Sequence, residues 1–110
     1  MGAVVIGTDG FFNDHIEHLA VLSIRNSVPA VYQYHQFVAA GGLASYGGSI
    51  LDSYRLAGGY VGRILKGEKP ADLPVQQASK IELLLNLKTA KTLGINVPQS
   101  VQNRADEVIE

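Results

Sequence analysis

The chain has 110 residues, 46% of them apolar, and a formal net charge of −1, which suits one domain with a single hydrophobic core. This charge balance gives no basic excess for nucleic acid or for an anionic membrane surface. The lack of cysteine excludes disulfides, thiolate catalysis and cysteine-ligated zinc. The opening, MGAVVIGTDG, has no basic region and no long apolar segment, so we expect neither a signal peptide nor a transmembrane helix in this sequence.

The first predicted element is a strand. Residues 3–7 (AVVIG) are a β-branched run, typical of a strand covered on both faces of a parallel α/β sheet. The loop at 8–13 would then lie at the carboxyl edge of the sheet, where open α/β folds bind ligands. Asn13 or Asp14 is the predicted cap of a helix that ends near Ser27. Residues at helical spacing form its expected inner face: Ile16, Leu19, Ala20, Ser23 and Ile24.

Two further strands are predicted next. Residues 29–34 (PAVYQY) form the second, and the intervening helix favours a right-handed crossover and parallel pairing. Residues 36–40 predict one helical turn. Residues 43–46 are a short apolar run that ends at the glycine pair 47–48, so we expect a buried third strand that ends in a tight turn.

The longest predicted helix covers residues 49–66. Ser49 and Asp52 form an S-x-x-D capping signature at its start, and Gly67 is the expected left-handed cap at its end.

Three glycines inside this helix, Gly58, Gly59 and Gly62, should each cost up to about 1 kcal/mol relative to alanine. We therefore expect the helix to pack tightly on the sheet. Residues 69–74 (KPADLP) follow it, and their two prolines predict an extended strap across a surface.

The remaining residues predict one more strand and two helices. Residues 81–87 (IELLLNL) form the fourth strand, and a short helix at 88–93 is stopped by Gly94. After an extended stretch at 95–98, Gln99 or Ser100 opens a last helix that reaches Ile109. The alternation predicts a single α/β domain over 1–110, with a small, mostly parallel sheet of about four strands and flanking helices.

Motifs for catalysis are weak. His15 and His18 lie three residues apart, beside Asp14 and Glu17, a spacing that can direct two imidazoles toward a metal. A zinc site needs more ligands, and His35 belongs to another predicted element, so a solvated helix face is the favoured interpretation. No G-x-S-x-G elbow, Walker A loop or G-x-G-x-x-G motif occurs. We expect no enzyme, no metal and no cofactor.

The loop at 8–13 offers a different chemistry. It places two aromatic rings, Phe11 and Phe12, beside the polar Asp9 and Asn13. Stacking surface together with a few polar anchors suits a small amphipathic ligand.

Five segments resemble the C-terminal part of the solute-binding proteins of ABC transporters, in the branch labelled tryptophan or tyrosine transport or uncharacterised. They are TDGFFN (8–13), GGLASYGGS (41–49), YVGRILKGEKPADLPVQQ (60–77), NLKTAKTLGINVP (86–98) and RADEVIE (104–110). The resemblance implies a type I periplasmic-binding-protein fold with two α/β lobes, a ligand clamped between them, hinge closure and delivery to a membrane permease. It also implies a periplasmic or extracellular location.

The resemblance also assigns positions. It places the helix at 49–66 in the first lobe and the strand before it in the second, and it implies that this sequence corresponds to the closing third of such a protein, either a truncated relative or a fragment. The loop at 8–13 would form one wall of the cleft, and residues 45–47 a hinge crossover. The implied ligand-binding residues are Thr8, Asp9, Phe11, Phe12, Asn13, Ser45, Tyr46 and Gly47.

Two functions are compatible with these patterns. The first is a solute-binding component, or remnant of one, that takes a small amino-acid-like or aromatic molecule for import. The alternative is a non-catalytic structural or dimerising α/β fragment without a ligand. We also expect no nucleic-acid partner, and a homodimer, because absent lobes would leave apolar surfaces and strand edges uncovered. The helix from Ser49 or the C-terminal helix is the candidate for exchange between subunits.

Overall fold

The computed structural model describes residues 2–77 and 80–110. Within these residues one five-stranded sheet has the order β1-β2-β3-β4-β5, in which only the β3–β4 pair is antiparallel. The strands are β1 (Val4–Val5), β2 (Ala30–Tyr32), β3 (Ala44–Gly48), β4 (Ile81–Asn86) and β5 (Glu107–Ile109). The helices are α1 (Gly10–Asn13), α2 (Ile16–Arg25), α3 (His35–Ala39), α4 (Ile50–Leu65), α5 (Leu87–Thr92) and α6 (Gln99–Gln102), with a 3₁₀ turn, η1 (Pro70–Asp72). The predicted α/β class and mostly parallel sheet are confirmed.

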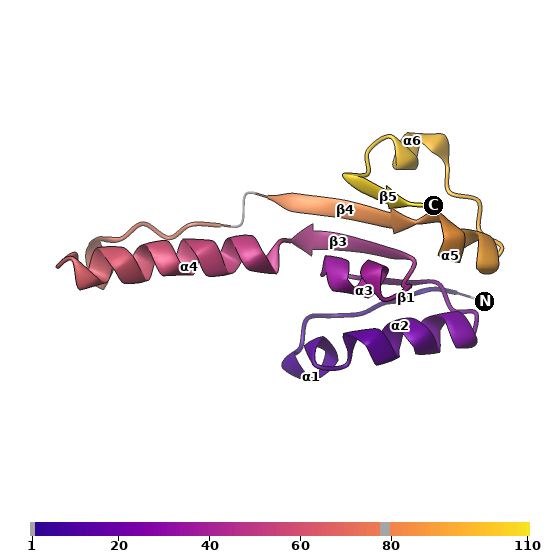
Figure 1. The fold of residues 1–110 in the computed structure, drawn as a ribbon, viewed down its shortest axis with the longest axis horizontal. Coiled ribbons are helices and arrows are strands. Elements are labelled where there is room, and N and C mark those ends of the chain that lie inside the picture. Colours follow the sequence, from indigo (N-terminus) through magenta and orange to yellow (C-terminus); the bar gives the residue numbers. More distant parts are fainter. Residues whose placement is uncertain (1, 78–79) are drawn as a thin grey trace.

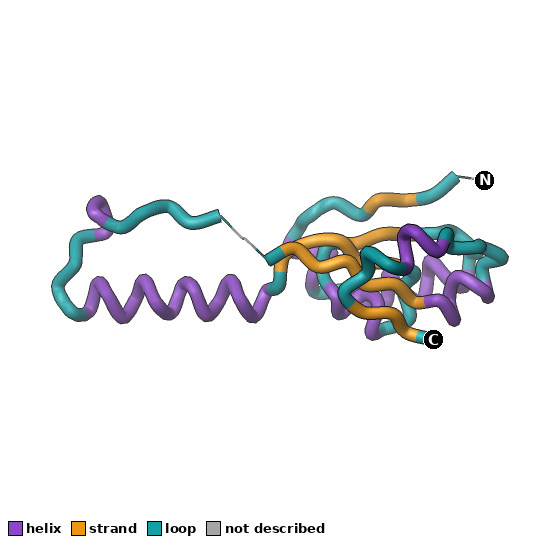
Figure 2. Tube along the Cα trace, turned by 90° about the horizontal axis from the view of Figure 1, so that it is seen from above, coloured by secondary structure: helices purple, strands orange, loops and turns teal. Residues whose placement is uncertain are grey.

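The elements form a body and a projecting arm. In the body, α2 and α3 lie together on one side of the sheet (Figure 1). The arm consists of residues 49–77: α4 extends away from the end of β3, and the segment after it runs back alongside (Figure 2). The molecule measures 56 × 31 × 20 Å with a radius of gyration of 17.1 Å, compared with about 13 Å for a compact domain of similar length. The arm accounts for this elongation.

The core lies between the sheet and α2 and α3. Its fully buried members are Ala20, Ala30, Tyr32 and Phe37, and the rings of Tyr32 and Phe37 meet edge to face with centroids 5.8 Å apart. Burial, followed by the neighbouring Tyr34, raises the pKa of Tyr32, and its hydroxyl donates a hydrogen bond to the Asn13 amide oxygen. The predicted inner face of α2 is therefore confirmed in its central residue, Ala20.

Two predictions near the N-terminus were wrong. The strand expected at 3–7 is only the two-residue β1, and it pairs with β2 at the edge of the sheet. Val4 and Val5 are 45% and 82% exposed, so this strand is not covered on both faces. The predicted caps Asn13 and Asp14 do not begin α2, because the short helix α1 intervenes and His15 occupies the cap position of α2 without a side-chain bond.

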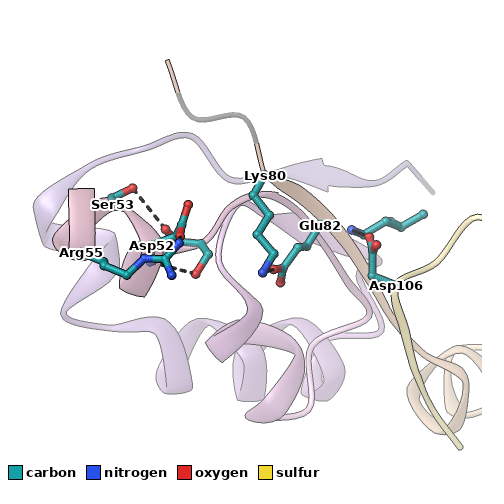
Figure 3. Close-up of polar contacts among 8 residues, drawn as sticks. Asp52, Ser53, Arg55, Lys80, Glu82 and Asp106 are labelled. Atoms are coloured by element: carbon teal, nitrogen blue, oxygen red, sulfur yellow. Dashed lines mark hydrogen bonds and ion pairs between the residues drawn. The ribbon is translucent and has the colours of Figure 1, made fainter. Parts of the chain in front are cut away.

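The start and end of α4 were predicted correctly. Ser49 Oγ accepts a hydrogen bond from the Asp52 amide at 3.2 Å, and Gly67 has φ +106°, a left-handed conformation that glycine adopts without strain. Figure 3 shows the first turn of α4, where Arg55 pairs with Asp52.

The expected packing of α4 on the sheet was wrong. No residue of α4 is buried, and a Cβ added at Gly58, Gly59 or Gly62 would meet nothing within 4 Å. The apolar stripe was a correct sign of an amphipathic helix, but periodicity does not reveal which element covers the stripe.

The proline segment returns along α4. Pro70–Asp72 forms a 3₁₀ turn, so the segment is not extended throughout as predicted. The Tyr60 hydroxyl donates to the Pro74 carbonyl, which holds the returning chain against the helix. Hydrogen bonds from Arg63 lower the pKa of Glu68 just beyond the helix end.

The last predicted helix is also different. α6 ends at Gln102, and the residues that would have continued it form β5 beside β4. Asp106 directs this change: its amide donates to the Leu83 carbonyl at 2.8 Å, and its Oδ2 accepts from the Leu83 amide at 2.7 Å. Figure 3 shows Asp106 in this position. Leu83, 23 residues earlier in the chain, thus provides the hydrogen-bond partners of Asp106, and the backbone continues as a strand instead of another helical turn.

The short helix before α6 agrees with the sequence. α5 begins one residue earlier than predicted, because Asn86 Oδ1 accepts from the Thr89 amide at 3.0 Å and ends β4. Gly94 follows with φ +72° and closes the helix.

Candidate functional site

Three parallel strands end at one edge of the sheet, and the loops that follow them are tied together there. Thr8, after β1, donates from Oγ1 to Gln33 Oε1 at 2.6 Å, and Gln33 directly follows β2. Gly47, near the end of β3, lies so close that a Cβ there would sit 2.4 Å from the Gln33 carbonyl oxygen. We call this region, residues 8–13, 33–34 and 45–49, the carboxyl edge. It is the position at which open α/β sheets bind ligands.

The two phenylalanines of the predicted loop have different roles. Phe11 is 65% exposed and its ring lies 4.4 Å from that of His15, measured between centroids. Phe12 instead packs against the buried core. Of the two rings, Phe11 is the one open to a ligand.

The polar residues of the loop hold its structure. Asp9 Oδ1 accepts from the Phe11 amide at 2.8 Å and so caps α1. Asn13 accepts from the buried Tyr32 hydroxyl. Both side chains therefore have internal partners in this state, and they fix the position of Phe11.

The predicted hinge residues lie on opposite faces of β3. Ser45 is 1% exposed and lies in register with Tyr32, on the core side. Tyr46 is 62% exposed on the other face, as the alternation of a strand requires. The structure thus brings Thr8 and Gly47 together through Gln33, presents Phe11 and Tyr46 to the exterior, and buries Ser45.

Sequence reasoning missed two residues at this edge. The Nε2 atom of Gln33 is buried and has no hydrogen-bond partner in the described part of the chain. Glu82 lies opposite Gly47 in the β3–β4 pair, 3.9 Å from the Lys80 ammonium (Figure 3). The rule that selected the loop after β1 would also have selected Gln33, because it follows the next predicted strand. Glu82 is the second residue of β4, and no local signal in the sequence reveals the antiparallel pairing of β4 with β3.

The arm leaves and rejoins the body at the same edge. α4 starts directly after β3, and the chain re-enters the sheet at Ile81, which is in register with Gly48. Both connections between body and arm therefore meet at one pair of opposed residues, Gly48 and Ile81.

A cavity of about 790 Å³ lies beside α2 and α3. Its lining includes all three histidines, His15, His18 and His35, together with Asp14 and Glu17, but no cluster of three or more possible metal ligands occurs among the described residues. From the predicted loop, only Asn13 reaches it. Searching the described residues also gives no helix with the length and hydrophobicity needed to cross a membrane.

Several solved structures are similar to this chain, and three of them are informative. A conserved domain protein from Vibrio cholerae is 30% identical with a TM-score of 0.83, covering 94% of this chain and 34% of its own. An ABC domain from Streptococcus pneumoniae, solved in complex with L-Trp, is 30% identical with a TM-score of 0.86, covering 99% of this chain and 38% of its own. The third is the ligand-free, open structure of a substrate-binding protein with adhesive properties from Clostridium difficile, which is 21% identical with a TM-score of 0.61. The match covers 97% of this chain and 36% of that chain. At this identity it supports only the assignment of the fold.

The chain thus spans about a third of the length of these solved relatives. No curated protein matches it significantly. The profile of a family described as ABC transporter substrate binding protein matches residues 1–109, which confirms the resemblance drawn from the sequence motifs. The chain belongs to the ABC transporter substrate-binding protein family.

Proposed function

We propose that this chain forms one wall and the hinge of a cleft that binds a small amino-acid-like or aromatic molecule for an ABC importer. The observation that carries the proposal is the carboxyl edge, where the loop at 8–13, Gln33 and the base of the arm converge. Support also comes from the relative solved with L-Trp, whose fold matches 99% of this chain. In a cleft that closes by hinge motion, the ligand would contact the surface beside the crossover, and the carboxyl edge lies beside the two connections between body and arm.

The proposed site has an aromatic and a polar component. Phe11 and Tyr46 provide exposed rings for apolar contact. Thr8, Asp9, Asn13 and Gln33 fix the backbone of the edge, and the unpartnered amide of Gln33 is suited to a carboxylate or carbonyl oxygen of the ligand. Ser45 and Gly47 shape the site without presenting a side chain at its surface. Ser45 is buried in the core, and Gly47 allows β3 to approach Gln33 closely.

We further propose that the partner in the membrane is an ABC permease, that the protein acts in the periplasm or outside the cell, and that the chain forms a homodimer. The dimer would cover the exposed apolar side chains of β1 and α4. Exchange of a C-terminal helix is excluded as its mechanism, because α6 ends at Gln102 and β5 follows. The alternative function, a dimerising fragment without a ligand, is favoured by the internal partners of Asp9 and Asn13.

A thermal-shift screen tests ligand binding. L-tryptophan, L-tyrosine, L-phenylalanine and a set of aliphatic and charged amino acids are added at millimolar concentration. A ligand at a hundred times its Kd should stabilise the native state by about 2.7 kcal/mol, a clear rise in Tm. A flat response to every compound would contradict the binding function and favour the alternative.

Two single substitutions separate binding from folding at this site. Phe11→Ala and Tyr46→Ala should each remove about 0.5–1.5 kcal/mol of contact energy with an aromatic ligand, which is roughly a two- to twelvefold rise in Kd. Since both rings are mostly exposed, the Tm without ligand should change little. Calorimetry measures both effects. Phe12→Ala is the matched control, because that ring packs on the core and its loss should lower Tm. Unchanged affinity in both test variants would remove these rings from the site.

A further inference from the structure

Gln33 and Glu82 line one small recess at the carboxyl edge, where β2 ends and β4 begins. Gly47 of β3, which has no side chain, lies between them. It is in register with Glu82, and a Cβ added to it would lie 2.4 Å from the Gln33 carbonyl oxygen. The other lining residues are His35, Ser45, Gly48 and Leu84.

Gln33 brings an unused hydrogen-bond donor to this recess. Its Oε1 accepts from Thr8 Oγ1 at 2.6 Å, whereas its Nε2 is buried and has no partner in the described part of the chain. An amide nitrogen carries two N–H donors, and buried polar groups are nearly always hydrogen-bonded. The free donor is suited to the oxygen of a carboxylate.

Glu82 brings an acceptor whose cation is held loosely. Its carboxylate lies 3.9 Å from the Lys80 ammonium (Figure 3), beyond hydrogen-bond distance. The Lys80 side chain is 66% exposed and that of Glu82 28%, so this is a surface ion pair of small energy. In the described part of the chain, Glu82 is the only acidic residue of the recess, and the lining contains no lysine or arginine. Its carboxylate can therefore exchange one ammonium group for another at little cost.

We propose that Glu82 recognises the α-ammonium group of the ligand while Gln33 Nε2 donates to the ligand's carboxylate. This assignment rests on the ligand-binding function and narrows the ligand class to α-amino acids. One carbon atom joins the two charged groups of an α-amino acid, so a protein must meet them at neighbouring positions. A single recess with both an acceptor and a free donor meets this requirement.

The ligand's ammonium group takes the place of the Lys80 ammonium at Glu82. The rest of the ligand then extends over the loop at 8–13, which Thr8 ties to Gln33 and which carries the exposed ring of Phe11. A site built to bond a polar group of its ligand rejects an analogue that lacks this group. Aromatic acids without an amine should therefore bind weakly.

Calorimetry with two matched probes tests the assignment. L-tryptophan and indolepropionic acid share the ring and the carboxylate, and only L-tryptophan has the α-ammonium group. The unmodified chain should bind L-tryptophan about ten- to a hundredfold more tightly, the usual contribution of a hydrogen bond to a charged group. Glu82→Gln keeps the size of the side chain, and it should weaken L-tryptophan binding by a similar factor while leaving the affinity for indolepropionic acid unchanged.

Two further variants serve as controls. Glu17→Gln removes the same charge from an exposed position of α2, in the lining of the cavity beside α2 and α3, and should leave L-tryptophan binding unchanged. Lys80→Ala removes the competing ammonium group, so it should raise the affinity for L-tryptophan by up to about fivefold. The Tm without ligand verifies that each variant is folded.

The outcomes separate this assignment from the ligand-binding function. Equal affinity of the unmodified chain for both probes, or full L-tryptophan affinity in Glu82→Gln, would overturn the role of Glu82 and leave the binding function intact. A loss of affinity in Glu17→Gln, or in Lys80→Ala, would equally contradict it. If neither L-tryptophan nor any other amino acid binds the unmodified chain, the binding function fails and the role of Glu82 fails with it.

Discussion

Replacing Phe37 with alanine should lower the free energy of unfolding by about 3–5 kcal/mol, the usual cost of emptying a buried aromatic site. The Phe37 side chain is fully buried and meets the Tyr32 ring edge to face. Gly42 packs directly on the Phe37 ring, since a Cβ there would lie 2.3 Å from it, and glycine has no side chain that could fill the space left by the ring. Urea denaturation followed by circular dichroism measures the change.

The matched control for this prediction is Phe11→Ala. The two residues have the same side chain, but Phe11 is 65% exposed, so its substitution should change stability by less than about 0.5 kcal/mol. Equal effects of the two variants would contradict the placement of the core between the sheet and α3.

Gly47→Ala is the second substitution with a large expected effect. The added Cβ would lie 2.4 Å from the Gln33 carbonyl oxygen and 3.1 Å from Gln33 Cβ. Because the obstacle is backbone, the ends of β2 and β3 must separate, at a cost of about 1–3 kcal/mol. The same movement would displace Gln33 from Thr8 and so weaken ligand binding at the carboxyl edge. Thermal unfolding and calorimetry measure the two consequences.

A glycine in open space provides the control. Gly59→Ala adds a methyl group with nothing within 4 Å, so it should leave stability unchanged or raise it by up to about 1 kcal/mol. If Gly47→Ala were as harmless as Gly59→Ala, the close approach that joins β2 to β3 would not exist.

Local signals in the sequence predicted much of the fold correctly. Ser49 and Asp52 begin α4, and Gly67 and Gly94 end helices with positive φ, because caps and left-handed glycines depend on neighbouring residues only. The same holds for β2, which begins directly after Pro29. The third strand was placed correctly, but its predicted end in a tight turn at the glycine pair 47–48 was wrong, because β3 runs through Gly48 and pairs there with Ile81. These signals determined the class and most of the element order.

Long-range contacts determined what the sequence could not reveal. Val108 and Ile109 fit a helical stripe equally well, yet the bonds between Asp106 and Leu83 make them a strand. The apolar periodicity of α4 predicts an amphipathic helix, but it does not predict which element, if any, covers the apolar side.

The candidate site shows the same division. The rule for parallel strands located the loop at 8–13, but it did not distinguish Phe11, which is exposed, from Phe12, which packs on the core. Gln33 was available to the same rule and was missed. Glu82 enters the edge only through the antiparallel pairing of β3 and β4.

The most direct test of the ligand-binding role is an NMR titration of the isotope-labelled chain with L-tryptophan, following each backbone amide. Saturable shifts are predicted at residues 8–13, at Gln33 and at residues 45–48, with small changes in α5 and β5. Saturable shifts confined to the cavity beside α2 and α3, or no shift at any concentration of L-tryptophan or of the other aromatic amino acids, would contradict the assignment of the carboxyl edge as the ligand wall.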